Sequence, residues 1–152
     1  MSNLLKKEKG FTLIEIVLVL AIAGLLLVIV FLAVSGAQKS RRDSQRKTDA
    51  GRILALSEQY ASNNNGAYPS SAANVTTLKN TYMNTGTWND PTTGTAYTLT
   101  YGIGTTSAAG EVRIASGAHC VNGALAALGG SARVAGVQIY EENGASYCVD
   151  NE

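Results

Sequence analysis

The first part of the chain contains an almost unbroken run of apolar residues. The run from Phe11 to Val34 covers 24 residues and is interrupted only by Thr12, Glu15 and Gly24. Within it, the 19 residues from Ile16 to Val34 carry no charge and as a helix extend about 28 Å, close to the hydrocarbon thickness of a bilayer. A cleaved secretory signal has a shorter apolar stretch, about 7 to 15 residues. The run therefore predicts a retained membrane-spanning helix and excludes an ordinary soluble enzyme.

The helical pattern continues beyond the apolar run. No proline precedes Pro69, so nothing forces a kink before that point. Within the polar segment 39–61, the apolar residues at helical spacing are Ala50, Ile53, Leu54, Leu56 and Tyr60. We expect this face to pack against a sheet. Asn63–Gly66 predicts the end of the helix.

Residues 70–95 and the segments after them differ in pattern. Thr, Asn and Gly dominate 70–95, which predicts a loop-rich connection in which Tyr82 and Trp88 pack against other apolar groups. Over 97–103, apolar residues alternate with Thr and Gly, as in a half-buried strand, and 112–114 predicts a shorter strand.

The C-terminus contains a hairpin signal. Segments 133–142 and 145–149 flank Asn143-Gly144, two residue types that tolerate positive φ. A two-residue turn would place Tyr140 opposite Tyr147 and Ile139 opposite Cys148. We therefore predict an α+β fold, in which a long N-terminal helix packs on a small antiparallel sheet of three or four strands.

Composition and candidate chemistry favour a structural protein. About 110 residues outside the apolar run are rich in Ser, Thr, Asn and Gly, enough for one small head domain. No nucleophile lies beside a base, and His119 next to Cys120 makes two candidate ligands without a carboxylate cluster. We expect no catalytic residue, no metal site and no cofactor.

The two cysteines, Cys120 and Cys148, enclose 27 residues. If the C-terminal part is extracytoplasmic, they predict a disulfide that contributes about 3 to 4 kcal/mol by closing this loop. Two buried free thiols are the alternative. The charged residues on both flanks of the apolar run do not settle the topology, but the paired cysteines favour an outside C-terminal part.

A motif at the start of the apolar run resembles a known signal. Lys9-Gly10-Phe11-Thr12-Leu13-Ile14-Glu15 combines a basic leader, a glycine, a phenylalanine and a glutamate four residues later, ahead of the long apolar helix. It is similar to the class III signal of type IV pilins and pseudopilins. The resemblance implies cleavage by a prepilin peptidase after Gly10 and methylation of the new amino terminus at Phe11. It also implies subunit assembly in which Glu15 pairs with the Phe11 amine of a neighbour.

The resemblance implies a plan for the whole chain. Residues 1–10 would be the leader, 11–35 the transmembrane and filament-core helix, 36–63 the amphipathic stem helix, and 64–152 the β head with a C-terminal disulfide loop. The ending from Tyr147 to Asn151 is also similar to pilin C-termini. The chain would span the cytoplasmic membrane once, be handled by the inner-membrane pilus assembly machinery, and end in a homo-oligomeric helical filament on the cell surface. Adhesion, motility and DNA uptake are the implied roles.

Two rival functions stay open. One is a pseudopilin of a type II secretion system, although the clustered acids of the major calcium-binding kind are missing from this head. The other is a single-pass anchored binding module that never polymerises, in which Glu15 would have no partner.

Charge is unevenly distributed along the chain. Residues 39–52 contain six basic and two acidic residues, a net charge of +4, whereas 53–152 contain three basic and seven acidic, a net charge of −4. The basic run is either a solvated helix face or a surface that steers the head of one subunit to the stem of another. DNA binding by the stem ranks below both, because assembled stems would be mostly covered.

Overall fold

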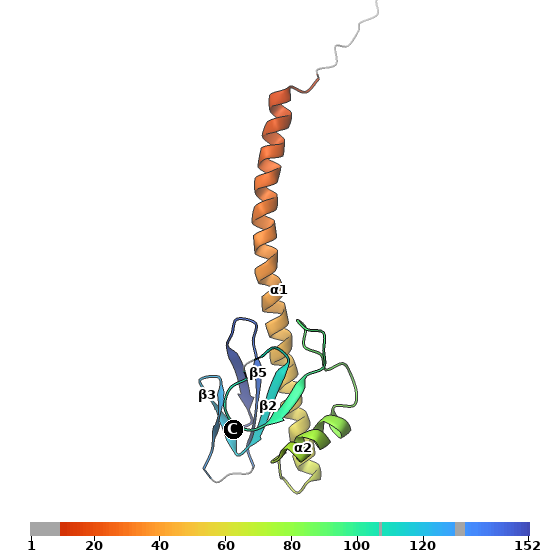
Figure 1. Cartoon of the computed structure of the whole chain (residues 1–152), viewed down its shortest axis with the longest axis vertical. Helices are drawn as coiled ribbons and strands as arrows, with labels where there is room; N and C mark the ends of the chain where they lie inside the picture. Colours follow the sequence, from red (N-terminus) through yellow and green to blue (C-terminus); the bar gives the residue numbers. More distant parts are fainter. Residues whose placement is uncertain (1–9, 107, 130–132) are drawn as a thin grey trace, which may run out of the picture. The chain divides into compact units, whose positions relative to one another are not determined.

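The structure is a computed structural model that describes residues 10–106, 108–129 and 133–152. The predicted leader, apart from Gly10, lies outside these residues. In chain order the elements are α1 (Leu13–Asn63), α2 (Ala72–Thr77), the π-helical turn η1 (Leu78–Tyr82), β1 (Thr98–Tyr101), β2 (Glu111–Ser116), β3 (Ala118–Val121), β4 (Ala124–Ala127), β5 (Ala135–Tyr140) and β6 (Ser146–Asp150) (Figure 1). Two compact units, residues 1–38 and 39–152, meet within α1.

Helix α1 is 51 residues long, as the absence of proline before Pro69 allows. It ends where the sequence predicted, because Asn65 and Gly66 adopt φ values of 56° and 80° and Gly66 N–H donates to the Ala61 carbonyl at 2.8 Å. In the first unit, the large apolar side chains are between 46% and 84% exposed. By length and composition, α1 is the one helix within the described ranges that is able to cross a membrane.

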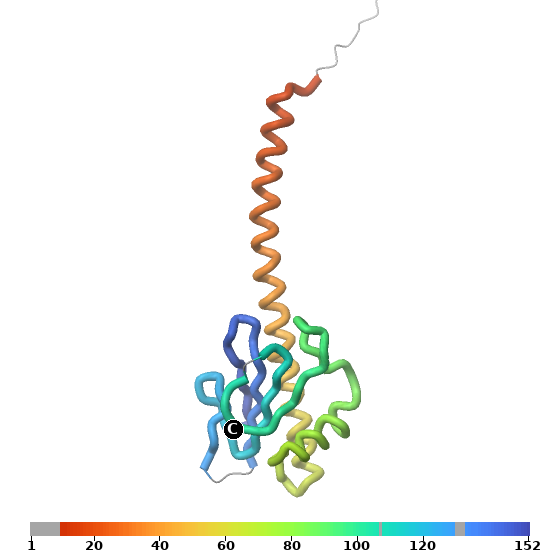
Figure 2. The backbone as a smooth tube through the Cα atoms, viewed as in Figure 1, coloured from red at the N-terminus to blue at the C-terminus, as the bar shows by residue number. Residues whose placement is uncertain are grey.

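The head core forms where the C-terminal part of α1 packs on a sheet (Figure 2). Ala50 and Ile53 of α1 are fully buried, Leu54 and Tyr60 nearly so, and Leu56 lies at the margin of the core. The predicted apolar face is thus confirmed. Its partners on the sheet are Val112, Ile114, Val137 and Ile139.

The four-stranded sheet has the order β1-β2-β5-β6, and β3 and β4 form a separate two-stranded sheet. The α+β fold is confirmed, but β1 runs parallel to β2, whereas we expected an antiparallel sheet. After β1 the chain leaves the sheet and pairs Gly104 with Leu125 of β4. It then returns to start β2 in the direction of β1, so no short hairpin joins the two strands.

The C-terminal hairpin differs in register from the prediction. Ile139 lies opposite Tyr147, Tyr140 opposite Ser146, and Gln138 opposite Cys148. The loop consists of three residues, 142–144, rather than two, because Glu141 N–H donates to the Ala145 carbonyl at 2.8 Å. Gly144 is the last residue of the loop and has a φ of 88°. A turn followed by a glycine in the left-handed region is the usual form of such a loop.

Two further parts of the head were not predicted. Residues 72–82 form α2 and η1 instead of a loop, and Ser71 caps α2 by accepting a hydrogen bond from Asn74 N–H. The β3–β4 hairpin turns at Asn122-Gly123, where φ is 49° and 79°. Its strands are short and alanine-rich, so the alternating pattern is weak there.

Candidate functional site

The N-terminus of α1 forms a capping box. Thr12 N–H and the Thr12 hydroxyl both donate to Glu15 Oε2, at 2.8 and 2.7 Å, and Glu15 N–H faces the Thr12 hydroxyl oxygen at 3.4 Å. These bonds satisfy donors that the first turn of a helix leaves without a partner. The Thr-x-x-Glu spacing is a sequence signal for this arrangement.

The residues before the helix are accessible. Gly10 to Thr12 precede the first helical residue, and a Cβ placed on Gly10 would meet no atom within 4 Å. Phe11 is 84% exposed. Together with Glu15, Ile16, Val19 and Leu20, Phe11 lines an open, mostly apolar hollow of about 440 Å³. An apolar ring and a carboxylate thus lie on one face, at helical spacing.

A second cluster is built around Arg46, a fully buried residue of α1. Its Nε donates to Asp90 Oδ2 at 2.7 Å and its Nη2 to Asp90 Oδ1 at 3.1 Å. Asp43 and Thr92 accept the remaining bonds, each at 2.8 Å. A buried charge is tolerated when it is paired and hydrogen-bonded in this way.

Asp90 is equally buried and belongs to the segment between η1 and β1. Its carboxylate also accepts the backbone N–H groups of Thr92 and Thr93, at 2.9 and 3.0 Å. Burial raises the pKa of Asp90, but the bonds from Arg46 and from these backbone groups outweigh burial, so the pKa lies below its ordinary value. Asp90 therefore stays ionised inside the head.

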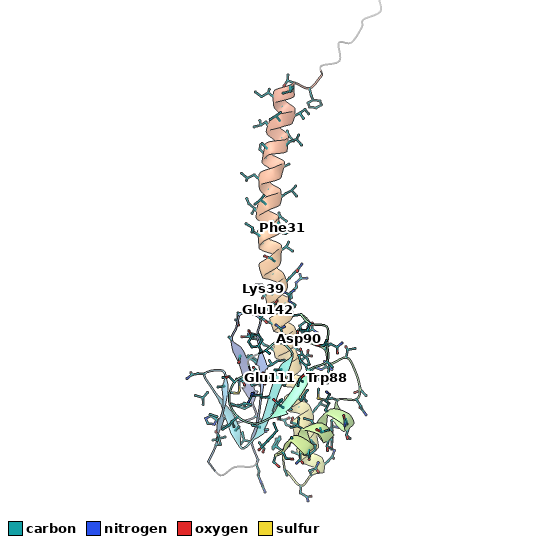
Figure 3. The ribbon with its side chains drawn as sticks, viewed as in Figure 1. Phe31, Lys39, Trp88, Asp90, Glu111 and Glu142 are labelled. Atoms are coloured by element: carbon teal, nitrogen blue, oxygen red, sulfur yellow. A yellow bond between two sulfur atoms is a disulfide. The ribbon has the colours of Figure 1, made fainter. Side chains whose placement is uncertain are left out.

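The loop of the C-terminal hairpin attaches to the same helix. Arg42 donates to both Glu142 carboxylate oxygens at 2.8 Å, and Lys47 approaches Glu141 at 2.8 Å. Asp43 accepts the Glu142 N–H at 2.9 Å. The hydrogen bonds with Arg42 hold the pKa of Glu142 below its ordinary value. Glu142 and Asp90 thus come from two separate segments that both bind α1 (Figure 3).

These contacts change the interpretation of the basic stem. Arg42, Arg46, Lys47 and Arg52 are all paired with carboxylates of the same chain. The stem is therefore neither a simple solvated face nor a fully available surface for the head of another subunit. The pairing also removes most of the positive charge that DNA binding by the stem would need.

Three aromatic residues of the head also contact side chains of α1. Tyr97, nearly fully buried, donates its hydroxyl to Asp49 at 3.1 Å, and burial together with this carboxylate raises its pKa. The rings of Tyr82 and Tyr60 pack edge to face, with their centroids 5.7 Å apart. Trp88 lies 4.3 Å from the Arg52 guanidinium, so both aromatic residues of the expected loop find partners.

The predicted disulfide is present and joins Cys120 on β3 to Cys148 on β6, linking the two sheets. His119, expected on a loop, lies on β3, where its Nδ1 is buried without a hydrogen-bond partner among the described atoms. Across the described ranges, no group of three or more His, Cys, Asp or Glu residues is arranged to hold a metal.

Three features characterise the chain: a long apolar helix, an exposed helix start with a capping box, and a small α+β head. Residues 5–31 match the model of the prokaryotic N-terminal methylation motif, the class III signal of type IV pilins. No curated protein and no solved structure matches the chain.

The motif supports a pilin-like or pseudopilin-like precursor that is anchored in the membrane before assembly. It implies processing by a prepilin peptidase and handling by membrane assembly machinery. The methylation motif, the apolar helix and the Cys120–Cys148 disulfide all fit the description of a pilin.

Proposed function

We propose that this protein is the structural subunit of a type IV pilus, cleaved after Gly10, methylated at Phe11 and assembled helically into a cell-surface filament. The observation that carries the proposal is the methylation motif at residues 5–31, placed at the start of a helix whose apolar side chains are exposed. In this proposal, residues 11–35 are the membrane and filament-core helix, 36–63 the stem, and 64–152 the head.

The exposed apolar side chains of the first unit require a cover. Water-exposed apolar surface of this extent is unfavourable by about 25 cal/mol per Å². Lipid covers it in the membrane, and neighbouring helices would replace lipid in a filament. Such an exchange needs no strong hydrophobic driving force, because lipid tails and leucine side chains are similarly apolar. Polar contacts would then set the register of subunits.

Glu15 is the polar group that we assign to this role. Its Oε2 accepts both bonds from Thr12, and within the described residues Oε1 accepts no hydrogen bond. After cleavage, Phe11 would carry a cationic amine, and Oε1 of a neighbouring subunit would supply its counter-charge. The hollow lined by Phe11, Glu15 and Ile16 supports this placement, since it puts the carboxylate beside an apolar docking surface.

The methylation motif also favours a second function, a pseudopilin of a secretion system, because pseudopilins have the same signal. A pseudopilin would form a short periplasmic filament, whereas a pilin would be recovered outside the cell.

Mass spectrometry of filaments sheared from cells separates the two functions. We expect a protein that begins at Phe11, with one methyl group on its amino terminus. Mature, methylated protein found only in the cell envelope would favour the pseudopilin. A chain that keeps residues 1–10, or begins elsewhere, would refute the proposed processing. The remaining function would then be the single-pass anchored binding module.

A further inference from the structure

The head contains a groove between η1 and β1. Two hollows of about 450 and 300 Å³ adjoin each other and share Lys79, Asn80 and Leu99. Together they form what we call the η1 groove, bounded by η1 on one side and by β1 and the 84–89 segment on the other. Both hollows fall within the size range of pockets that bind small molecules.

Polar side chains without partners line this groove. They are Lys79, Asn80, Asn84 and Asn89, and within the described ranges none of these side chains makes a hydrogen bond or ion pair. Each amide offers two donors and one acceptor oxygen. The three asparagines are exposed to solvent, so their amides are available to a ligand rich in hydroxyl groups.

The aromatic wall of the groove is held in place. The Trp88 indole N–H donates to the Thr85 carbonyl at 3.2 Å, and the Arg52 guanidinium lies over the ring at 4.3 Å. Arg52 is itself bound to Asp49 at 3.2 Å and lines a neighbouring hollow, not the groove. Trp88 itself lines both hollows. A fixed aromatic surface with a negative π-face is suited to the C–H groups of a sugar ring.

The charge and shape of the groove further restrict the chemical class of ligand that it can bind. Among the described residues, Lys79 is the one charged residue that lines the groove, and no carboxylate does. Nucleic acid binding depends on several phosphate contacts, which one lysine does not supply. An added peptide strand is also disfavoured, because α2 contacts the edge strand β1. The π-helical turn, a form often found at functional sites, places both Lys79 and Asn80 in the groove.

We propose that the η1 groove binds a short oligosaccharide that carries a carboxylate. One sugar ring stacks on Trp88, the amides of Asn80, Asn84 and Asn89 bind hydroxyl groups, and Lys79 pairs with the carboxylate. The site lies wholly in the head, so the proposal holds whether or not the chain forms filaments.

Intrinsic fluorescence provides the test, because Trp88 is the sole tryptophan. The full chain is kept in a zwitterionic detergent that has no sugar headgroup. It is titrated with sialyllactose and trigalacturonate, which carry carboxylates, and with lactose and maltotriose, which do not. We expect a saturable change in Trp88 fluorescence with at least one acidic oligosaccharide, and affinity about tenfold weaker for the neutral sugars, since one charge-assisted hydrogen bond is lost.

Two lysine variants locate the site. Lys79→Gln should lower the affinity for the acidic oligosaccharide about tenfold and leave the neutral sugars unchanged. Lys39→Gln, which alters another exposed lysine outside the groove, should behave as wild type. Both lysines are exposed and make no bond in the described structure, so folding should survive, as circular dichroism would check.

Three results would overturn the proposal. The first is no saturable response to either acidic oligosaccharide. The second is equal loss of affinity in Lys79→Gln and Lys39→Gln. The third is a fluorescence change that follows protein concentration rather than sugar concentration, which would make a second copy of the chain the occupant of the groove.

Discussion

Removing the charge of Asp90 tests whether the buried pair with Arg46 stabilises the attachment of the head to α1. Both side chains have 0% exposure. Loss of one member of a buried, hydrogen-bonded pair leaves the other charge without its counter-ion, which costs about 3 to 5 kcal/mol. In Asp90→Asn the Asp43 carboxylate still lies 2.8 Å from Arg46 Nη1, so we expect the lower end of this range, about 3 kcal/mol.

Arg46→Met tests the same pair from the other side and adds a pH signature. With Arg46 present, the pKa of Asp90 is lowered, so the stability it contributes is present above the unfolded pKa of an aspartate and is lost as the pH falls through the folded value. Without Arg46, the pKa of Asp90 lies higher than in wild type, because burial still raises it and only the backbone bonds from Thr92 and Thr93 still lower it. The variant therefore gains less stability than wild type as the pH rises. The difference between wild type and Arg46→Met should therefore grow from about pH 4 to pH 7.

Urea unfolding of the full chain in detergent, followed by Trp88 fluorescence, measures these free energies. The double variant Arg46→Met/Asp90→Asn should lose less than the sum of the single variants, because it removes both members of the pair and leaves neither as an uncompensated buried charge. Lys47→Met is the matched control, since Lys47 pairs with Glu141 at a similar distance but is 46% exposed. It should cost less than about 1 kcal/mol. A loss below about 1 kcal/mol in Arg46→Met at pH 7, or a loss that does not vary with pH, would refute the reasoning.

Three further predictions concern processing, assembly and the disulfide. Gly10→Val adds a branched side chain beside the scissile bond and should leave full-length precursor in the membrane, whereas Gly10→Ala should be cut; mature protein of normal size from Gly10→Val, seen by immunoblot, would contradict the class III processing. Glu15→Gln keeps the capping box with Thr12 but removes the negative charge. Like Glu15→Ala, it should give processed protein that forms few filaments in cells that lack filament retraction. If Glu15→Gln gave wild-type yields of sheared filaments, the helix cap and not the charge would be what assembly requires. Cys148→Ser should lower the free energy of unfolding by about 3 to 4 kcal/mol, and an unchanged urea midpoint under non-reducing conditions would argue against this contribution.

Local patterns account for much of what the sequence predicted. The apolar run and the absence of proline predicted a long helix, because helix formation depends on neighbours within one or two turns. Asn65 and Gly66 marked its end for the same reason, since these residue types adopt positive φ at little cost. The N-terminal motif is also local, since it lies within residues 5–31, which match the N-terminal methylation motif.

Local patterns did not predict which residues far apart in the sequence pair with each other. Asp90 lies in a segment of Thr, Asn and Gly and is 44 residues from Arg46, so nothing near it in the sequence indicated that it would be buried and paired. β1 and β2 are parallel neighbours, and between them the chain makes a bridge from Gly104 to Leu125, a residue 21 positions further along the chain. The hairpin register was wrong by one residue because Glu141 pairs with Ala145, and Asn143-Gly144 fits a two-residue and a three-residue loop equally well.

The sequence by itself therefore determined the membrane-length helix, the N-terminal methylation motif at residues 5–31, the apolar face of the stem and the pair of cysteines. The tertiary structure decided which carboxylates neutralise the basic stem, which strands are neighbours and where the η1 groove opens. The physical reason is the distance along the chain over which each kind of interaction acts. Periodicity and backbone preference act between residues close in the chain, whereas charge pairing, register and grooves arise from contacts between segments that only the folded head brings together.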